Sequence, residues 1–168
     1  MSDREHAHRE SDMTSTEPTR TSRPAPGNTR RTALNWWQAV LFGAGAATVL
    51  NLLVWGAAQA SGATLALVEP GEPDYVIQAG SVVSSSIAPM VLGIVLASVI
   101  ARWWTGVLRL AQVLGALMAV GTLWSVFAYG ADAATITSLT LMHLISGTVV
   151  VLALEGLRRH VLAARRAP

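Results

Sequence analysis

The stretch WWQAVLFGAGAATVLNLLVWGAAQA, residues 36–60, contains no charged side chain and decides the class of this protein. An α-helix rises about 1.5 Å per residue, so this stretch is long enough to cross the hydrocarbon core of a bilayer, which is about 30 Å thick. Further uncharged, apolar stretches follow at residues 81–100, 110–129 and 134–154. The sequence therefore predicts four transmembrane helices.

The composition of the whole chain supports this class. Of its 168 residues, 52% are hydrophobic and only 13% are charged, and the charges are concentrated between the apolar stretches. The absence of cysteine excludes disulfides, thiolate nucleophiles and thiolate-ligated metal centres. The net charge is only +2 and arginines lie beside the apolar stretches, where membrane orientation explains them, so we expect no nucleic-acid partner.

Short connections predict how the spans are arranged. They make consecutive helices antiparallel neighbours, so the expected fold is an all-α, four-helix transmembrane bundle with up-down-up-down topology. This domain covers residues 36–157 and is followed by a basic cytoplasmic tail at residues 158–168. Residues 1–35 combine polar and charged residues with almost no aliphatic ones, which predicts a disordered cytoplasmic N-terminal tail.

The charged residues between the spans predict their orientation. Arginines lie before the first span, between the second and third, and after the fourth: Arg30, Arg31, Arg102, Arg109, Arg158, Arg159, Arg165 and Arg166. The other two connections contain only acidic residues: Glu69, Glu72, Asp74 and Asp132. Basic residues favour the cytoplasmic side, and tryptophans at positions 36, 37, 103 and 104 fit the same inner interface. We expect a multi-pass protein of the cell membrane with both termini in the cytoplasm.

A cleaved signal peptide is the alternative interpretation of the first span. The twin arginines Arg30 and Arg31 precede it, and Ala58-Gln59-Ala60 resembles a cleavage site. Cleavage would leave three spans. The apolar stretch exceeds the length of a usual signal core, about 7 to 15 residues, and contains bulky side chains. We therefore expect four intact spans.

His143 is the most informative polar residue, because it lies near the middle of the fourth span and far from any charged residue. Ionisable groups inside a membrane often mark pathways for protons, ions or ligands. The alternative is a neutral histidine hydrogen-bonded to a neighbouring helix. Both interpretations place His143 inside the bundle.

Helical spacing supplies neighbours for His143. Thr140 lies one turn away on the same helix face, while Thr48 and Asn51 share a face of the first span. A hydrogen bond between Asn51 and His143 is geometrically compatible with antiparallel spans. These four residues form the candidate intramembrane polar site, with simple helix association as the alternative role of the asparagine.

Two features predict how the helices pack. Pro89 has no backbone N–H and should bend the second span. Small residues that permit close helix approach recur every four positions, at Gly43 and Ala47 and at Ala111, Gly115 and Ala119.

The segment at residues 154–164 is expected to continue the fourth helix along the inner membrane surface. In this prediction one face, formed by Leu154, Leu157, Val161 and Ala164, contacts lipid. The basic residues would bind anionic lipid headgroups at about 1 kcal/mol each: Arg158, Arg159, Arg165 and Arg166.

The sequence contains none of the familiar catalytic arrangements. It has no paired carboxylates within the spans, no zinc-binding HExxH and no glycine-rich phosphate loop. Only one histidine lies inside a span, which excludes a bis-histidine haem within the chain. We expect neither enzymatic activity nor a metal or cofactor.

Several short motifs are similar to a known family: Ala47-Thr48-Val49-Leu50-Asn51, Pro89, Asp132-Ala133-Ala134-Thr135 and Leu141-Met142-His143-Leu144. Over about residues 37–157 the chain resembles the four-helix membrane proteins grouped as domain of unknown function 6069, which occur mainly in actinobacteria. The resemblance implies the same four-span architecture and directs attention to Asn51, Pro89, Asp132 and His143. It implies no activity, substrate or cofactor.

Two functional hypotheses follow from the sequence. The first is a non-catalytic interaction or accessory protein whose partners are membrane lipids and either a second copy of the chain or another membrane protein. The alternative is a small transport or proton-coupled module that uses His143 and Asn51.

Overall fold

The structure is a computed structural model that describes residues 33–68, 71, 73–128 and 130–166. Most of the predicted N-terminal tail, the acidic residues Glu69 and Glu72, and the last two residues lie outside the described part of the chain.

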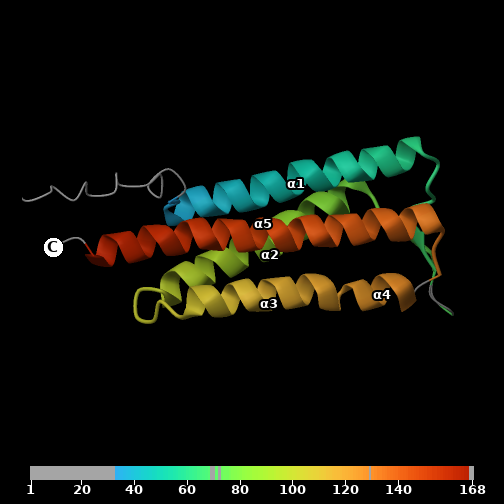
Figure 1. The fold of residues 1–168 in the computed structure, drawn as a ribbon. Helices are drawn as coiled ribbons and strands as arrows, with labels where there is room; N and C mark the ends of the chain where they lie inside the picture. Colours follow the sequence, from blue (N-terminus) through green and yellow to red (C-terminus); the bar gives the residue numbers. More distant parts are fainter. Residues whose placement is uncertain (1–32, 69–70, 72, 129, 167–168) are drawn as a thin grey trace, which may run out of the picture.

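The described residues form a bundle of apolar helices (Figure 1). Its elements are α1 (Trp36–Ala60), β1 (Ala66–Leu67), β2 (Tyr75–Val76), α2 (Ala79–Ile100), α3 (Val107–Gly121), α4 (Leu123–Ala128) and α5 (Ala133–Arg166). The helices α3 and α4 together make one span, so four helical segments of the described chain are long and apolar enough to cross a membrane. The predicted all-α, four-span fold is confirmed.

The first span has the predicted bounds, and the structure adds detail at its start and within the third span. Asn35 and Gln38 form a capping box, in which each side chain accepts from the other residue's backbone N–H, and the Leu34 N–H donates to Gly156 O at 3.0 Å. The fold therefore begins before residue 36. The third span is interrupted at Thr122, whose hydroxyl donates to Met118 O at 2.8 Å.

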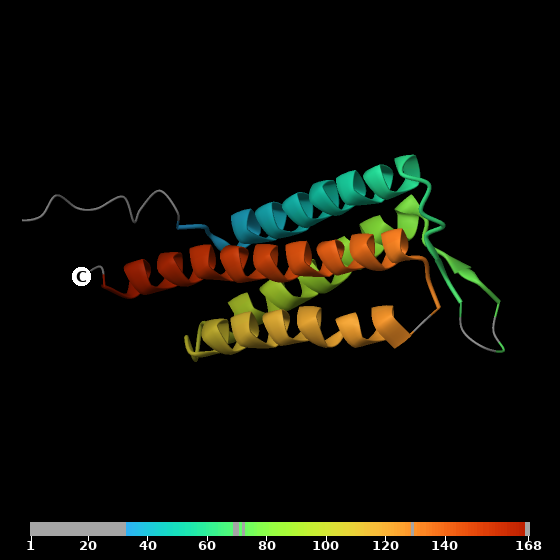
Figure 2. The same ribbon diagram turned by 45° about the vertical axis from the view of Figure 1, so that its right-hand side comes forward.

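At the other end, α5 continues to Arg166 as one unbroken helix, so residues 158–166 are not a separate tail (Figure 2). The predicted helical continuation is correct, but the lipid exposure predicted for Leu154, Leu157 and Val161 is wrong, whereas Ala164 is exposed. Leu154 and Leu157 are buried to 1% and 2% exposure, and Val161 packs against the same core. The beginning of α1 and the α2–α3 connection cover this face, with Ala39 and Ala101 in the same cluster.

The central helix of the bundle is α5. It packs against α1 on one side and α3 on the other, while α2 packs mainly against α1. The third span has little contact with α1 or α2, and only 11% of its most apolar window is buried, compared with 28% for the first and fourth spans. The third span is thus attached to the rest of the bundle mainly through α5.

Small residues allow the close contacts that the sequence predicted. Gly43 faces Met90 and Ile94 of α2, where Ile94 Cδ1 lies 2.9 Å from the position a Cβ would take. Between α5 and α3, a Cβ on Gly147 would lie 2.8 Å from the Cβ of Ala119, and one on Gly115 would lie 2.9 Å from Val150. The small residues of the third span therefore line its contact with α5.

The substitution Gly147→Val should weaken the attachment of the third span. The added side chain overlaps Ala119, and overpacking of this kind costs about 1–3 kcal/mol. We expect a lower midpoint of thermal unfolding for the protein purified in detergent. The control is Gly45→Val in the middle of α1, where no atom lies within 4 Å of the added Cβ. Equal midpoints for the two variants would contradict this account of the packing.

Candidate functional site

Asn51 joins three helices in the middle of the bundle. Its buried side-chain amide donates to Ser86 Oγ on α2 and to Ser146 Oγ on α5, each at 3.0 Å. Gly43 and Ala47 precede Asn51 on the same buried face, so α1 approaches its neighbours closely enough for these short side chains to meet. Hydrocarbon offers no competing hydrogen-bond partner, and such interhelical bonds typically stabilise a bundle by about 0.6–2 kcal/mol.

The hydrogen bond predicted between Asn51 and His143 is not formed. The His143 Nδ1 lies 2.7 Å from Leu139 O in its own helix, and no bond from His143 to another helix occurs within the described part of the chain. Asn51 instead lies level with Ser146, one turn further along α5. The sequence analysis missed both Ser86 and Ser146, although Ser146 shares the turn that follows His143.

Three buried oxygens in the candidate polar site have no hydrogen-bond partner among the described residues. They are Thr48 Oγ1, Asn51 Oδ1 and Thr140 Oγ1. Leaving a buried polar group unpaired costs about 1–3 kcal/mol, so each oxygen favours a bound hydrogen-bond donor. Three of the four residues predicted for this site thus retain acceptor capacity.

Pro89 lies on an exposed side of α2, which remains one continuous helix. Pro89 has no N–H to donate to the Ser85 carbonyl. The Ser85 hydroxyl donates to Val82 O, at 3.2 Å. The kink at Pro89 stays a prediction.

A second polar cluster surrounds Glu155 and connects α3 to α5. Arg158 binds the carboxylate through two atoms at 2.8 and 2.9 Å, and Arg159 binds it at 3.0 Å. Gln112 of α3 is buried and donates to Glu155 Oε2 at 3.3 Å and to Val151 O at 3.1 Å.

Arg109, also from α3, completes this cluster. It donates to Gln112 Oε1 at 3.2 Å, and its guanidinium lies 3.9 Å from Glu155. The sequence analysis missed Gln112 and Glu155 as functional residues. Two signals were present: Gln112 is a lone amide within an apolar span, and Glu155 precedes Arg158 and Arg159 at the spacing of helical ion pairs.

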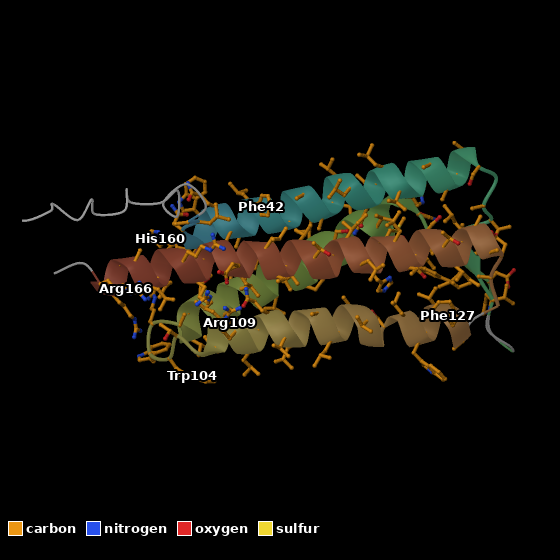
Figure 3. The ribbon with its side chains drawn as sticks, viewed as in Figure 1. Phe42, Trp104, Arg109, Phe127, His160 and Arg166 are labelled. Atoms are coloured by element: carbon orange, nitrogen blue, oxygen red, sulfur yellow. The ribbon has the colours of Figure 1, made fainter. Side chains whose placement is uncertain are left out.

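Arginines at the end of α5 bond to other groups of the protein. Arg165 donates to the carbonyls of Ala101 and Arg102, at 3.2 and 3.1 Å, and so caps the end of α2. Figure 3 shows Arg109, Arg166, His160 and Trp104 at the same end of the bundle. Three of the four arginines predicted to bind lipid headgroups are therefore engaged within the protein, and their contact with lipid stays a prediction.

The opposite end of the bundle is held by Asp132, which caps the N-terminus of α5. Its carboxylate accepts from the Thr135 N–H at 2.9 Å and from the Thr135 hydroxyl at 2.6 Å. It also accepts from the N–H and the hydroxyl of Thr64, which follows α1. The bonds from Thr135, followed by those from Thr64, hold the pKa of Asp132 well below its usual value near 3.8.

The connection between α1 and α2 is fixed by further bonds near Asp132. The Leu65 N–H donates to Thr135 Oγ1 at 2.9 Å, and Leu65 is fully buried with a left-handed φ of 51°. Val68 and Gly130 exchange two backbone hydrogen bonds, and the Trp55 indole donates to Ile77 O at 3.0 Å. These bonds make the Asp132 region a structural clamp.

A family model described as a family of unknown function, DUF6069, matches residues 31–160. The chain belongs to this family. The match includes Asn51, Asp132 and Glu155, so the polar contacts centred on these three residues lie within the family domain of this DUF6069 protein. No curated protein and no solved structure matches the chain.

The Asp132 clamp should make the stability of this DUF6069 protein depend on pH. A carboxyl group with a lowered pKa in the folded state stabilises the fold above its usual pKa, and this contribution is lost as the pH falls towards the lower folded value. We expect thermal stability in detergent to hold down to about pH 4 and to decrease at lower pH.

The variant Asp132→Asn should be less stable than the wild type at neutral pH and should lose less stability on acidification. Asp74→Asn, which changes an exposed carboxylate in the α1–α2 connection, serves as the control. A wild-type acid profile in the Asp132→Asn protein would show that another carboxylate is responsible.

Proposed function

We propose that this protein is a non-catalytic interaction or accessory protein of the cytoplasmic membrane. The observation that carries the proposal is the bonding of Asn51, whose side-chain amide donates two hydrogen bonds, both to neighbouring helices. Other polar side chains of the spans, such as Thr137, Ser138 and Thr148, donate to carbonyls of their own helix. Asn51 thus joins helices and the other three residues bond within α5, so these polar groups of the described chain serve the helices and do not converge on one reacting centre.

The third span supplies the proposed interaction surface. Its large apolar side chains are strongly exposed, including Leu117 at 61%, Met118 at 69% and Trp124 at 80%. Such a surface is compatible with lipid, with a second copy of the chain or with another membrane protein.

The proposed orientation places both termini in the cytoplasm. It is supported by the distribution of charge in the described residues, because Arg102, Arg109 and Arg158 lie at one end of the bundle and Asp74 and Asp132 lie at the other. The excess of arginine favours the cytoplasmic side.

Reporter fusions test this orientation. A reporter fused after Pro168 and one fused before Trp36 should both report cytoplasm, whereas one inserted at Gly71 should report the outside. The mass of the mature protein tests the signal-peptide alternative at the same time, since a chain that starts at Ser61 has lost the first span. A C-terminus outside the cytoplasm would overturn the proposed topology.

The second candidate function is a small transport or proton-coupled module. The observation in its favour is the set of unpartnered oxygens at Thr48, Asn51 and Thr140, which share the middle of the bundle with His143. A pathway would require His143 to exchange a proton or bind a ligand, and no amide side chain can exchange a proton in its place near neutral pH.

Substitutions at Asn51 and His143 separate the two functions. If the polar residues are structural, Asn51→Leu should lower the thermal stability of the purified protein, because two interhelical bonds are lost, at about 0.6–2 kcal/mol each. His143→Gln and His143→Leu should have smaller effects, since within the described residues His143 bonds to Leu139 of its own helix. Cells that carry the His143 variants should match the wild type where deletion has a phenotype. A His143→Gln protein that inserts and folds normally but behaves as the deletion would favour the transport module.

A further inference from the structure

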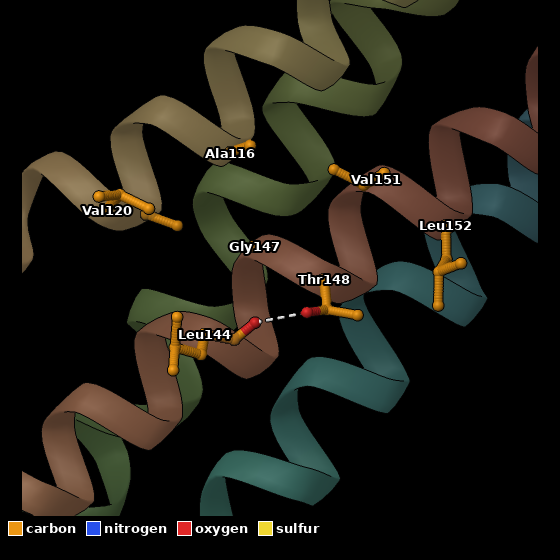
Figure 4. A pocket seen from close by; sticks show the side chains of 8 residues that line it. Ala116, Val120, Leu144, Gly147, Thr148, Val151 and Leu152 are labelled. Carbon is orange, nitrogen blue, oxygen red and sulfur yellow. Dashed lines mark hydrogen bonds between the residues drawn. The ribbon is translucent and has the colours of Figure 1, made fainter.

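An apolar groove of about 310 Å³ runs between α3 and α5 (Figure 4). Ala116, Ala119 and Val120 form one wall, and Gly147, Thr148 and Val151 contribute to the other. The Thr148 hydroxyl donates to Leu144 O at 2.8 Å, so its polar atom is used by its own helix. The groove therefore presents hydrocarbon groups to its occupant.

The two walls of the groove lead to the charged cluster around Glu155. On α3, Ala119, Ala116, Gln112 and Arg109 follow one another at intervals of three or four residues, and so lie on one helix face. On α5, Thr148, Glu155 and Arg159 also lie on one helix face, because they are seven and four residues apart. The two helix faces that form the groove therefore continue to the charged cluster around Glu155.

The charged cluster carries more positive than negative charge. Arg109 and Arg158 lie beside Glu155, the one carboxylate of this cluster among the described residues, so these three groups carry an excess of one positive charge (2 − 1 = 1). The side chains of Arg109 and Arg159 are 64% and 44% exposed, whereas that of Glu155 is only 21% exposed. The outer surface of the cluster is therefore cationic.

The separation between the arginines and the groove fits one leaflet of a bilayer. Arg159 and Thr148 are eleven residues apart on α5, which corresponds to about 16 Å along the helix axis. Half of the hydrocarbon core measures about 15 Å. A lipid whose headgroup lies level with Arg159 would have its acyl chain at the depth of the groove.

We propose that the α3–α5 groove binds one anionic phospholipid. Its phosphate is held by the guanidinium group of Arg109, which suits the geometry of phosphate oxygens, and one acyl chain lies against Ala116 and Thr148. This inference assigns a ligand to the proposed membrane interaction protein. It is tested separately, because lipid retention is measured on the purified full-length chain without any partner.

Native mass spectrometry of the full-length protein in detergent tests the proposal. We expect one molecule of phosphatidylglycerol to bind more tightly than phosphatidylcholine of the same chain length. Arg109→Gln should weaken phosphatidylglycerol binding roughly fivefold, and Ala116→Leu, which fills the groove, should weaken it by at least as much. The controls Arg102→Gln and Ala57→Leu, at exposed positions away from the groove, should bind as the wild type does.

Several outcomes would overturn the proposal. Equal binding of the two lipids would remove the role of charge, and an equal loss in Arg102→Gln would indicate a diffuse surface effect. Binding of glycerol phosphate as tight as that of the lipid would indicate a site for free phosphate. A dimer that Ala116→Leu dissociates would show that a second copy of the chain occupies the groove. Arg109→Gln adds no bulk to the bundle, so it tests the site even where Ala116→Leu fails to fold.

Discussion

The structure depends on the lack of hydrogen-bond partners in hydrocarbon, which favours bonds between the polar side chains of the spans and other protein groups. Asn51 meets this constraint by joining α1 to Ser86 on α2 and Ser146 on α5. Gln112 meets it by bonding to Val151 O and Glu155 on α5. In both cases small residues on the same helix face, such as Ala47 or Gly115, let the helices approach closely.

Each of the other spans forms hydrogen bonds with residues in or next to the central helix α5. Near its first turn, Asp132 holds Thr64 and thereby the connection between α1 and α2. In its middle, Ser146 bonds to Asn51 of α1. Near its end, Glu155 and Gln112 hold α3, and Arg165 caps α2. Every other span is therefore fixed through bonds that α5 makes at a different level.

The sequence was sufficient for the fold and insufficient for the partners of the polar residues. Long uncharged stretches predict spans directly, and the first span was predicted at its observed bounds, residues 36–60. The rotation of each helix was harder to predict, because lipid-facing and core-facing sides are both apolar and the spans lack an amphipathic pattern. The expected lipid exposure of Leu154 and Leu157 was wrong because the beginning of α1 and the α2–α3 connection cover this face. Asn51 was paired with His143, whereas Ser146 is the residue of α5 at its level.

Because the third span is attached mainly through α5, the Glu155 cluster has a consequence beyond stability. Arg109 lies 3.9 Å from Glu155 and donates to Gln112, so it belongs to the contact between α3 and α5. In the proposed complex, a phosphate bound to the Arg109 guanidinium competes with Glu155 for that group. The acyl chain in the groove also lies between α3 and α5. Ligand binding and the attachment of α3 are then linked, because a ligand shifts a conformational equilibrium by the difference in its affinity for the two states. The span with the least burial is thus the one whose position the surrounding lipid is best placed to control.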